Sequence, residues 1–289
     1  MSWEISVRIT QLNIYPVKSL RGIALEEAKL VETGLAHDRE WMLVDSVGRF
    51  VTQRELPAMA TISVFLDAET LRLEHPSREP LCVPLGTPET LDERLRHTVY
   101  VWKDRCEALD EGDEASRWLT DVLGELKGSQ LRLVRFAPEH RREVEGDFLK
   151  PNEQSHTRFA DGYPLLVVNT ASLNALNKQL AEQGVEAVPM NRFRPNIVVE
   201  GEPAFAEVSW AELMTAGKGR LGLRKPCQRC KIITQDQHSG VAPAPKEPLR
   251  SLVLMGTQPG WRGAFFGQNA IVLEGVGTTL RVGECLAAK

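Results

Sequence analysis

The chain alternates short runs of β-branched and aromatic residues with turn-forming residues, and this pattern favours a fold built mainly of strands. Gly, Pro and Asp separate the runs, as they do between the strands of β-sheet proteins. In the first half the runs are residues 5–15, 41–44, 50–52, 61–66, 71–73 and 98–102. Because no long helix separates them, they indicate a barrel or sandwich rather than a series of βαβ units. We expect a mostly β fold with a few helices, of the α+β class.

Two segments show helical periodicity instead. Apolar residues recur at helical spacing from 113 to 124, with Asp113 expected as the N-cap and Gly124 near the end. A second helix is expected to have Thr170 as its cap and Gly184 at its end. Further strands are expected at 131–136, 163–168, 196–200, 231–234, 270–274 and 279–282. Four tryptophans within predicted strands or helices are expected to fill the core: Trp41, Trp102, Trp118 and Trp210.

Residues 137–157 are polar and poorly periodic, which is typical of a surface loop or a domain junction. We therefore divide the chain into an N-terminal barrel-like domain, residues 1–137, and a second β domain, residues 138–289. The helix near 113–124 belongs to the first domain. A length of 289 residues is ample for two such domains.

Composition narrows the possible partners and compartments. The chain has 35 Lys and Arg against 39 Asp and Glu, a net charge of −4, so a nucleic-acid polymer or an anionic membrane is not expected as the main partner. No apolar run approaches the roughly 18 residues of a membrane span, and the N-terminus lacks the pattern of a secretory signal. Five cysteines without regular spacing do not form a disulfide framework. We expect a cytoplasmic protein with reduced thiols.

The sharpest local motif is Cys227-Gln228-Arg229-Cys230. A structural zinc site needs four ligands, and no second cysteine or histidine pair of suitable spacing is present. A redox dithiol usually lies between a strand and a helix of a βαβ unit, whereas the residues after Cys230 predict a strand. Lys225, Arg229 and Lys231 crowd the segment with positive charge, which favours a thiolate that can ligate a metal. Two half-buried cysteines on a basic surface strand are an equally good interpretation of these residues alone.

Basic residues also lie at the ends of several predicted strands. Lys18 and Ser19 follow the first strand, Arg39 precedes the strand at 41–44, and Arg194 precedes the strand at 196–200. Side chains at strand ends can converge at the mouth of a barrel, and Arg, Lys and Ser together are suited to binding a phosphate. The sequence therefore predicts an anion site that adjoins the cysteine segment.

Five motifs carry a resemblance to a known family: PVKS, HDR, FRPN, CxRC and FGQ, in this order. The run that begins YPVKSLRG resembles the β-barrel domain that precedes MOSC domains, and the run from NRFRPNIVV to VGE is similar to the MOSC domain itself. The resemblance spans roughly Ile5 to Glu284. It is nearest to the group that contains the mitochondrial amidoxime reducing component and its bacterial single-chain relatives.

The resemblance implies an N-terminal MOSC β-barrel domain followed by a MOSC β-barrel domain that bind molybdenum on molybdopterin. Cys230 matches the cysteine that ligates the metal and is therefore the implied catalytic and metal-binding residue, whereas the role of Cys227 stays open. Gln228 stands where the eukaryotic members usually have serine, and Asn269 replaces a tyrosine after FGQ. The residues implied to bind the cofactor are Lys18, Ser19, Arg39, Arg194, Asn196, Gln228, Arg229 and Asn269.

The implied activity is the reduction of small N-hydroxylated compounds: amidoximes, hydroxylamines and N-hydroxylated bases. Iron–sulfur domains need about four cysteines, and only Cys285 follows the motif, so we expect no ferredoxin domain. Electrons are then expected from a separate ferredoxin, flavodoxin or reductase. The alternative is a carrier of molybdopterin or of a persulfide on Cys230, without reductase activity. A third possibility is a barrel that keeps the fold without a cofactor.

Overall fold

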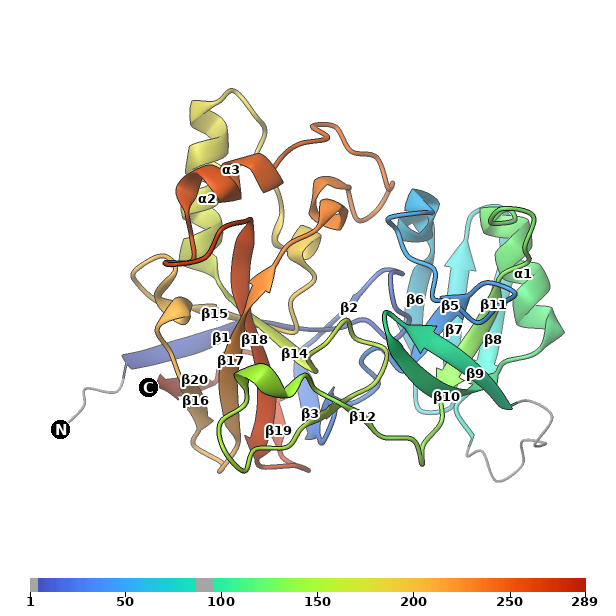
Figure 1. Ribbon diagram of the computed structural model, residues 1–289, viewed down its shortest axis with the longest axis horizontal. Coiled ribbons are helices and arrows are strands. Elements are labelled where there is room, and N and C mark those ends of the chain that lie inside the picture. The colour runs from blue at the N-terminus through green and yellow to red at the C-terminus, as the bar shows by residue number, and fades with distance from the viewer. Residues whose placement is uncertain (1–4, 87–95) are drawn as a thin grey trace.

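The structure is a computed structural model that describes residues 5–86 and 96–289, and it has two β lobes. The larger lobe is a closed barrel, and the smaller lobe is an open, half-barrel arrangement of two sheets (Figure 1). The expectation of a mostly β fold with a few helices is confirmed. Among the described residues, no helix is long and apolar enough to cross a membrane.

Seven strands form the larger barrel, in the order β15-β14-β18-β17-β16-β20-β1, and antiparallel pairing between β1 and β15 closes it. Short β2 (Ile23–Leu25) extends the sheet beside β1. The barrel strands are β1 (Ile5–Ile14), β14 (Leu165–Asn169), β15 (Ile197–Glu200), β16 (Glu212–Thr215), β17 (Arg220–Gln228), β18 (Phe265–Glu274) and β20 (Cys285–Ala288).

Alternation of buried and exposed side chains explains how these strands enclose a core. Along β1, Val7 and Ile9 are buried, and after a register shift between Ile9 and Gln11 the buried positions are Leu12 and Ile14. Strand β14 is buried at every position because the barrel covers one face and helix α2 (Thr170–Glu182) packs on the other. A separate three-stranded sheet has the order β19-β3-β4 and consists of β3 (Glu27–Val31), β4 (Gly34–Leu35) and β19 (Thr279–Arg281).

The smaller lobe consists of one four-stranded and one three-stranded sheet. The first has the order β5-β11-β10-β9 and the second the order β6-β7-β8. Helix α1 (Asp113–Leu123) packs against β11 and β8. The strands are β5 (Trp41–Val44), β9 (Arg96–Val101), β10 (Asp104–Asp110), β11 (Arg132–Phe136), β6 (Ser63–Leu66), β7 (Thr70–His75) and β8 (Arg78–Pro84).

Both predicted helices are present, but their N-caps differ from those expected. Gly112 caps α1 without a side-chain hydrogen bond, so Asp113 is the first helical residue and places its charge in the first turn. In α2 the cap is Asn169, whose side chain accepts a hydrogen bond from the amide of Ala171. A short third helix, α3 (Leu249–Met255), was not predicted.

The largest error of the sequence analysis lies directly after the cysteines. Residues Lys231–Thr234 form a 3-10 helix, η7, and not a strand, because the strand of this region is β17 and ends at Gln228. The apolar run at 50–52 makes only an isolated bridge, between Phe50 and Val44. Trp41, Trp118 and Trp210 are buried as expected, but Trp102 is 54% exposed at the turn between β9 and β10.

The polar segment at 137–157 contains short elements of its own. Strands β12 (Arg142–Glu143) and β13 (His156–Thr157) pair with each other, and a 3-10 helix covers Gly146–Phe148. Further 3-10 helices are η1 (Pro57–Thr61), η5 (Met190–Phe193) and η6 (Ala206–Val208). The domain boundary near residue 137 stays a prediction. The strand pairing adds that β1 and β3 are hydrogen-bonded to strands of the C-terminal half.

Candidate cofactor site

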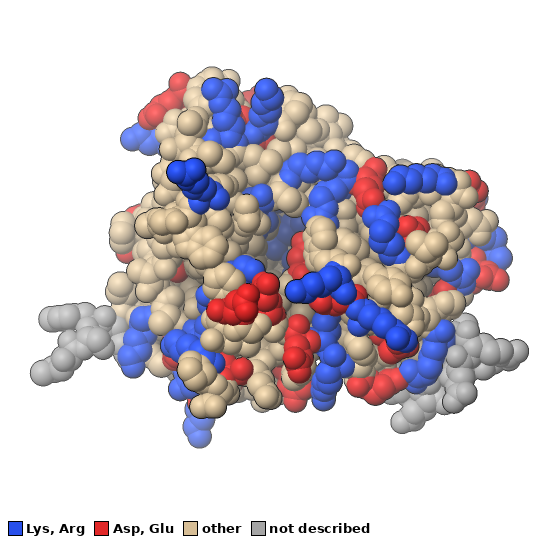
Figure 2. Space-filling view, in the orientation of Figure 1, with Lys and Arg blue, Asp and Glu red and all other residues tan. Residues whose placement is uncertain are grey.

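A cavity of about 370 Å³ lies between the two lobes, and Figure 2 shows it as a hollow with Lys and Arg side chains around it. Both halves of the chain contribute to its wall, from the turn after β1 to the middle of β18. All nine residues that the sequence analysis assigned to the site line this cavity: Lys18, Ser19, Arg39, Arg194, Asn196, Gln228, Arg229, Cys230 and Asn269.

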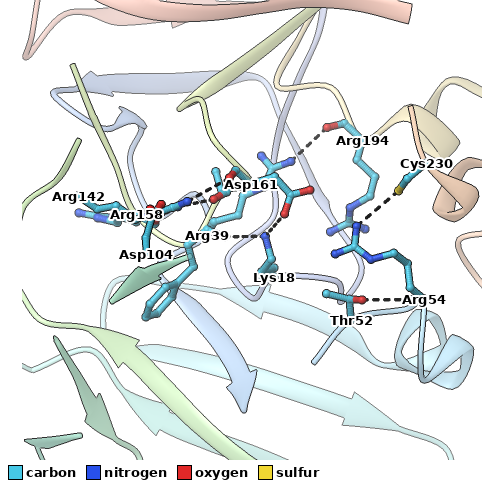
Figure 3. A network of polar contacts seen from close by, with 12 residues as sticks. Lys18, Arg39, Thr52, Arg54, Asp104, Arg142, Arg158, Asp161, Arg194 and Cys230 are labelled. Atoms are coloured by element: carbon cyan, nitrogen blue, oxygen red, sulfur yellow. Dashed lines mark hydrogen bonds and ion pairs between the residues drawn. The ribbon is translucent and has the colours of Figure 1, made fainter. Parts of the chain in front are cut away.

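Lys18 lies in the turn after β1, where its amide donates to the carbonyl of Trp41 at 2.8 Å. Its Nζ donates to the carbonyl of Phe159 at 2.8 Å and forms an ion pair with Asp161 at 2.5 Å (Figure 3). Burial lowers the pKa of Lys18, and the carboxylate of Asp161 opposes that shift. Burial alone would raise the pKa of Asp161, but Lys18 outweighs it and holds this pKa well below its usual range. Asp161 therefore lines the cavity as a carboxylate.

Two arginines from different lobes meet at the ring of Tyr15. The guanidinium carbons of Arg39 and Arg194 each lie 4.2 Å from the ring centroid. Arg39 also donates to the carbonyl of Arg194 at 3.2 Å and pairs with Asp38 at 2.5 Å. Burial raises the pKa of Tyr15 to about 12, so its ring is neutral and presents a π face to both cations. Arg39 and Arg194 are thereby held side by side at the cavity wall.

Arg194 carries the least compensated charge of this group. It caps the 3-10 helix η5 with φ of 54°, and its Nη1 donates to the side-chain oxygen of Gln237 at 2.9 Å. Within residues 5–86 and 96–289, no carboxylate lies at ion-pair distance from it. Burial lowers the pKa of Arg194 to about 10. A buried cation without a counter-ion is unfavourable unless a ligand supplies one.

Asn196 holds other groups in place rather than offering free polar atoms. Its Oδ1 accepts from the amide of Leu166 and from Nη1 of Arg39, both at 3.1 Å. Its Nδ2 donates to the carbonyl of Asn13 at 3.2 Å. Asn196 thus links three segments and orients Arg39 toward the cavity.

The cysteine segment separates its two thiols into different environments. Cys227, in β17, packs against the hydrophobic cluster around Phe193 and accepts a hydrogen bond from Nη1 of Arg229 at 2.7 Å. The second Nη of Arg229 donates to the carbonyl of Phe193 at 2.7 Å. Cys230 is the N-cap residue of η7 and lines the cavity. Both cysteines line the cavity, but Cys227 holds Arg229, whereas the Cys230 thiol contacts a cation from the other lobe.

That cation is Arg54, which the sequence analysis missed. Its Nη1 donates to Sγ of Cys230 at 3.7 Å (Figure 3). Of the three charges expected to act on this thiol, Lys225 pairs with Glu145 at 2.6 Å and Arg229 contacts Cys227, whereas Lys231 is exposed and has no ion-pair partner among the described residues. Arg54 and Asp161 lie far along the chain from the cysteines, and only the meeting of the two lobes identifies them as site residues.

The rival interpretations of the cysteine motif can now be tested. No group of three or more His, Cys, Asp or Glu able to hold a metal occurs in the part of the chain that the structure describes, which excludes a zinc site built from those residues there. The sequence analysis argued against a redox dithiol because it predicted a strand after Cys230. That prediction is wrong, since a 3-10 helix follows Cys230. Strand β17 pairs antiparallel with β18, however, so the motif does not lie in a βαβ unit.

The wall as a whole is strongly cationic. Two carboxylates, Glu145 and Asp161, face six basic side chains, although the whole chain carries a net charge of −4. Gln228 is exposed at the end of β17, and Asn269 lies half-buried opposite Lys225 in the β17–β18 ladder. The basic residues are Lys18, Arg39, Arg54, Arg194, Lys225 and Arg229. An anionic group with hydrogen-bonding edges suits this wall.

The chain is similar in sequence to two known domains and to several named proteins. The sequence profile of the MOSC N-terminal beta barrel domain matches residues 6–126, and that of the MOSC domain matches residues 154–286. The chain is 34% identical to mitochondrial amidoxime-reducing component 1 of Homo sapiens, over 96% of this chain and 81% of that protein. It is 31% identical to mitochondrial amidoxime reducing component 2 of Bos taurus, over 84% of this chain and 70% of that protein.

A third relative has a different name. The molybdenum cofactor sulfurase of Oryza sativa subsp. japonica is 28% identical over 96% of this chain, which covers 35% of that longer protein. Two domain matches in sequence, together with relatives above 30% identity over most of their length, establish the relationship. The chain belongs to the MOSC-domain family, in the group that includes the mitochondrial amidoxime-reducing components.

Proposed function

We propose that this protein is a molybdenum-cofactor-dependent reductase of N-hydroxylated compounds that receives electrons from a separate redox protein. The observation that carries the proposal is the position of Cys230, which faces a cationic cavity built by both lobes. The names of the relatives support the substrate class: amidoximes, and by extension hydroxylamines and N-hydroxylated bases.

The side chains of the cavity fit a pterin that carries a phosphate and a metal bound through sulfur. Arg194 is a half-buried cation without an ion-pair partner among the described residues, and its pKa is lowered by burial. A phosphate beside it would supply the missing negative charge. The Cys230 thiolate is a soft ligand of the kind that molybdenum accepts. When bound, the cofactor supplies two-electron redox chemistry at the metal.

The cavity residues are assigned to different parts of the cofactor. We assign Lys18, Ser19, Arg39 and Arg194 to the anionic and hydrogen-bonding part of the pterin, with Asn196 orienting Arg39. Arg229, Gln228 and Asn269 line the opposite wall and would contact the same group. Cys230 would ligate the metal, and Arg54 would donate a hydrogen bond to its sulfur.

Asp161 is suited to orient the substrate. Because Lys18 keeps it ionised, its carboxylate can accept a hydrogen bond from an N–H of an amidoxime. The overall reaction breaks the N–O bond, consumes two protons and two electrons, and releases the amidine and water. A carboxylate at this position also favours the amidine product as its cation, which forms at neutral pH.

The proposal is tested with protein from cells that can or cannot make molybdopterin. Both preparations are assayed for benzamidoxime reduction with reduced methyl viologen as the electron donor. We expect activity, molybdenum and pterin fluorescence only in the first preparation. Equal activity in both would refute a role for the cofactor, and a fully loaded protein without activity would refute the reductase.

A second candidate function rests on Cys230 itself. A cysteine that accepts a charge-assisted hydrogen bond from Arg54 suits a persulfide, and one relative is named a molybdenum cofactor sulfurase. In that case the protein would carry sulfur or the pterin without reducing a substrate. Intact mass before and after thiol reduction separates the two functions, because only a carrier would lose a sulfur atom from Cys230 on reduction.

A further inference from the structure

A second hollow, of about 750 Å³, opens beside the cavity and shares Thr52 and Arg54 with it. We define the Trp102 patch as five of its residues: Phe50, Arg54, Trp102, Lys103 and Lys231. The patch combines one lobe's hairpin turn with the residue that directly follows Cys230. It therefore lies at the border of the candidate cofactor site and the molecular surface.

Trp102 is the most unusual residue of this patch. It occupies the two-residue turn between β9 and β10 with φ of 56°, a conformation that favours Gly or Asn and is unfavourable for a bulky side chain. The residue is 54% exposed, although tryptophan is usually largely buried. A strained and exposed aromatic residue at a hairpin tip indicates a role outside folding.

Trp102 is also connected to the sulfur of Cys230 by direct contacts. The guanidinium carbon of Arg54 lies 4.6 Å from the centroid of the Trp102 ring, and Phe50 packs edge-on against that ring at 5.0 Å. The same guanidinium donates to Sγ of Cys230 at 3.7 Å. One side chain therefore bridges the exposed ring and the thiol, and electron transfer is favoured by such a short, continuous path.

The charge of the patch indicates the kind of partner. Lys103 and Lys231 are exposed, and neither forms an ion pair with any described residue. Arg49 and Glu55, at the edge of the hollow, neutralise each other at 2.8 Å. The Trp102 patch therefore carries a net positive charge, whereas the whole chain has a net charge of −4. An acidic partner would be attracted to the patch and repelled from much of the remaining surface.

We propose that the Trp102 patch is the docking surface for a small acidic one-electron carrier protein and that electrons enter the site there. The inference rests on the proposed reductase function. Each encounter oxidises one carrier by one electron, and two encounters with two protons from solvent reduce one N-hydroxylated substrate to its amine or amidine and water. Transient redox contacts of this kind are small and steered by charge, which agrees with a patch of five residues.

Binding is tested first, on cofactor-free protein, with an acidic plant-type [2Fe–2S] ferredoxin as the probe. The variant carries Lys103→Glu and Lys231→Glu, and the matched control is Lys178→Glu, an exposed lysine of α2 on the other lobe. At low ionic strength we expect the variant to raise the Kd about tenfold or more and the control to leave it unchanged. The wild-type affinity should fall when salt is raised to about 0.15 M.

Turnover on loaded protein gives the second measurement. We expect the double variant to lose kcat/KM for the reduced ferredoxin in proportion to its loss of affinity. Because Lys231 adjoins Cys230, the activity control is measured on Lys103→Glu alone: its benzamidoxime reduction with methyl viologen should stay within about twofold of wild type, since this small donor needs no docking surface. Trp102→Gly removes the ring at a position where glycine is unstrained, so it should fold as well as wild type and still slow the ferredoxin reaction.

Two outcomes would overturn the docking surface: wild-type protein that does not bind the ferredoxin at low salt, or a double variant that binds and reacts as wild type does. Failure of the reductase function has a different signature. Loaded wild-type protein would then be inactive with methyl viologen, whereas ferredoxin binding to the patch is measured without any turnover.

Discussion

Arg54, in the smaller lobe, donates a hydrogen bond to the sulfur of Cys230, in the larger lobe, at 3.7 Å. The proposed metal ligand, Cys230, therefore accepts a hydrogen bond from a side chain in the other half of the chain. Lys18 and Asp161, also from the two halves of the chain, form an ion pair at 2.5 Å and line the same cavity. Neither lobe alone carries the whole site, and the following predictions depend on this division.

The Arg54 contact should matter for catalysis more than for folding. Arg54→Gln removes a charge-assisted hydrogen bond to the sulfur, and we expect activity per bound molybdenum to fall about tenfold or more. Arg54→Lys keeps the charge and should recover part of the activity. The measurement is the rate of benzamidoxime reduction with methyl viologen, normalised to molybdenum content. Equal rates for Gln and wild type would show that the contact has no catalytic effect.

The two cysteines of the motif should behave differently. Cys230→Ser should lose most of the bound molybdenum, because serine is a poor ligand for a metal that accepts soft donors. Cys227→Ser should retain the metal, since that thiol is engaged by Arg229 and packs against the Phe193 cluster, although Cys227 also lines the cavity. Metal analysis of freshly purified protein checks both variants. Retention of molybdenum by the Cys230 variant would remove the proposed ligand.

Arg194 should strengthen binding of the cofactor but lower the stability of the cofactor-free protein. Arg194→Gln removes a half-buried charge whose pKa is lowered by burial, together with its hydrogen bond to Gln237. We expect the melting temperature of the cofactor-free variant to rise by about 2 °C or more and its pterin content to fall. Thermal unfolding and pterin fluorescence test the two effects separately. A cofactor-free variant less stable than wild type would contradict the unpaired cation.

The Lys18–Asp161 pair predicts a dependence of stability on pH. The folded-state pKa of Asp161 is held below its ordinary value near 4, so its ionisation stabilises the fold above that pH and the contribution disappears as pH falls through the folded-state pKa. Asp161→Asn removes this contribution. Its melting temperature should be lower than that of wild type at pH 7, and the difference should shrink below about pH 4. Asp147→Asn, in the exposed 3-10 helix, is the matched control. A constant difference across this range would contradict the shifted pKa.

The sequence predicts strands well where both faces of the strand are apolar or where apolar and polar residues alternate. The run at 41–44 coincides with β5, and the run at 5–15 covers β1. Strands β8 and β10 were missed because one face of β8 is exposed and polar residues interrupt both. Strand β17 was missed because Pro226 and three basic residues mask its alternation. These three segments are strands because they pair with neighbouring strands, which the local sequence does not reveal.

The sequence predicted those site residues that lie in recognisable short motifs, and it missed those that do not. All nine assigned residues meet at one cavity: eight lie at a strand end or in a connecting segment that faces the junction of the lobes, and Asn269 lies within β18. Their roles in binding stay predictions. Arg54 and Asp161 carry no local signal of function, since a single arginine after an apolar run and a single aspartate before a strand occur in many surface loops. Their partners, Cys230 and Lys18, are each more than 100 residues away.

The antiparallel ladder between β1 and β20 has a consequence for biosynthesis. Val7 pairs with Leu286, so the barrel cannot close until nearly all of these residues have left the ribosome. Lys18 and Cys230 reach their final positions only after that closure. Any large prosthetic group held by both residues must then enter after the barrel strands have been synthesised and have paired.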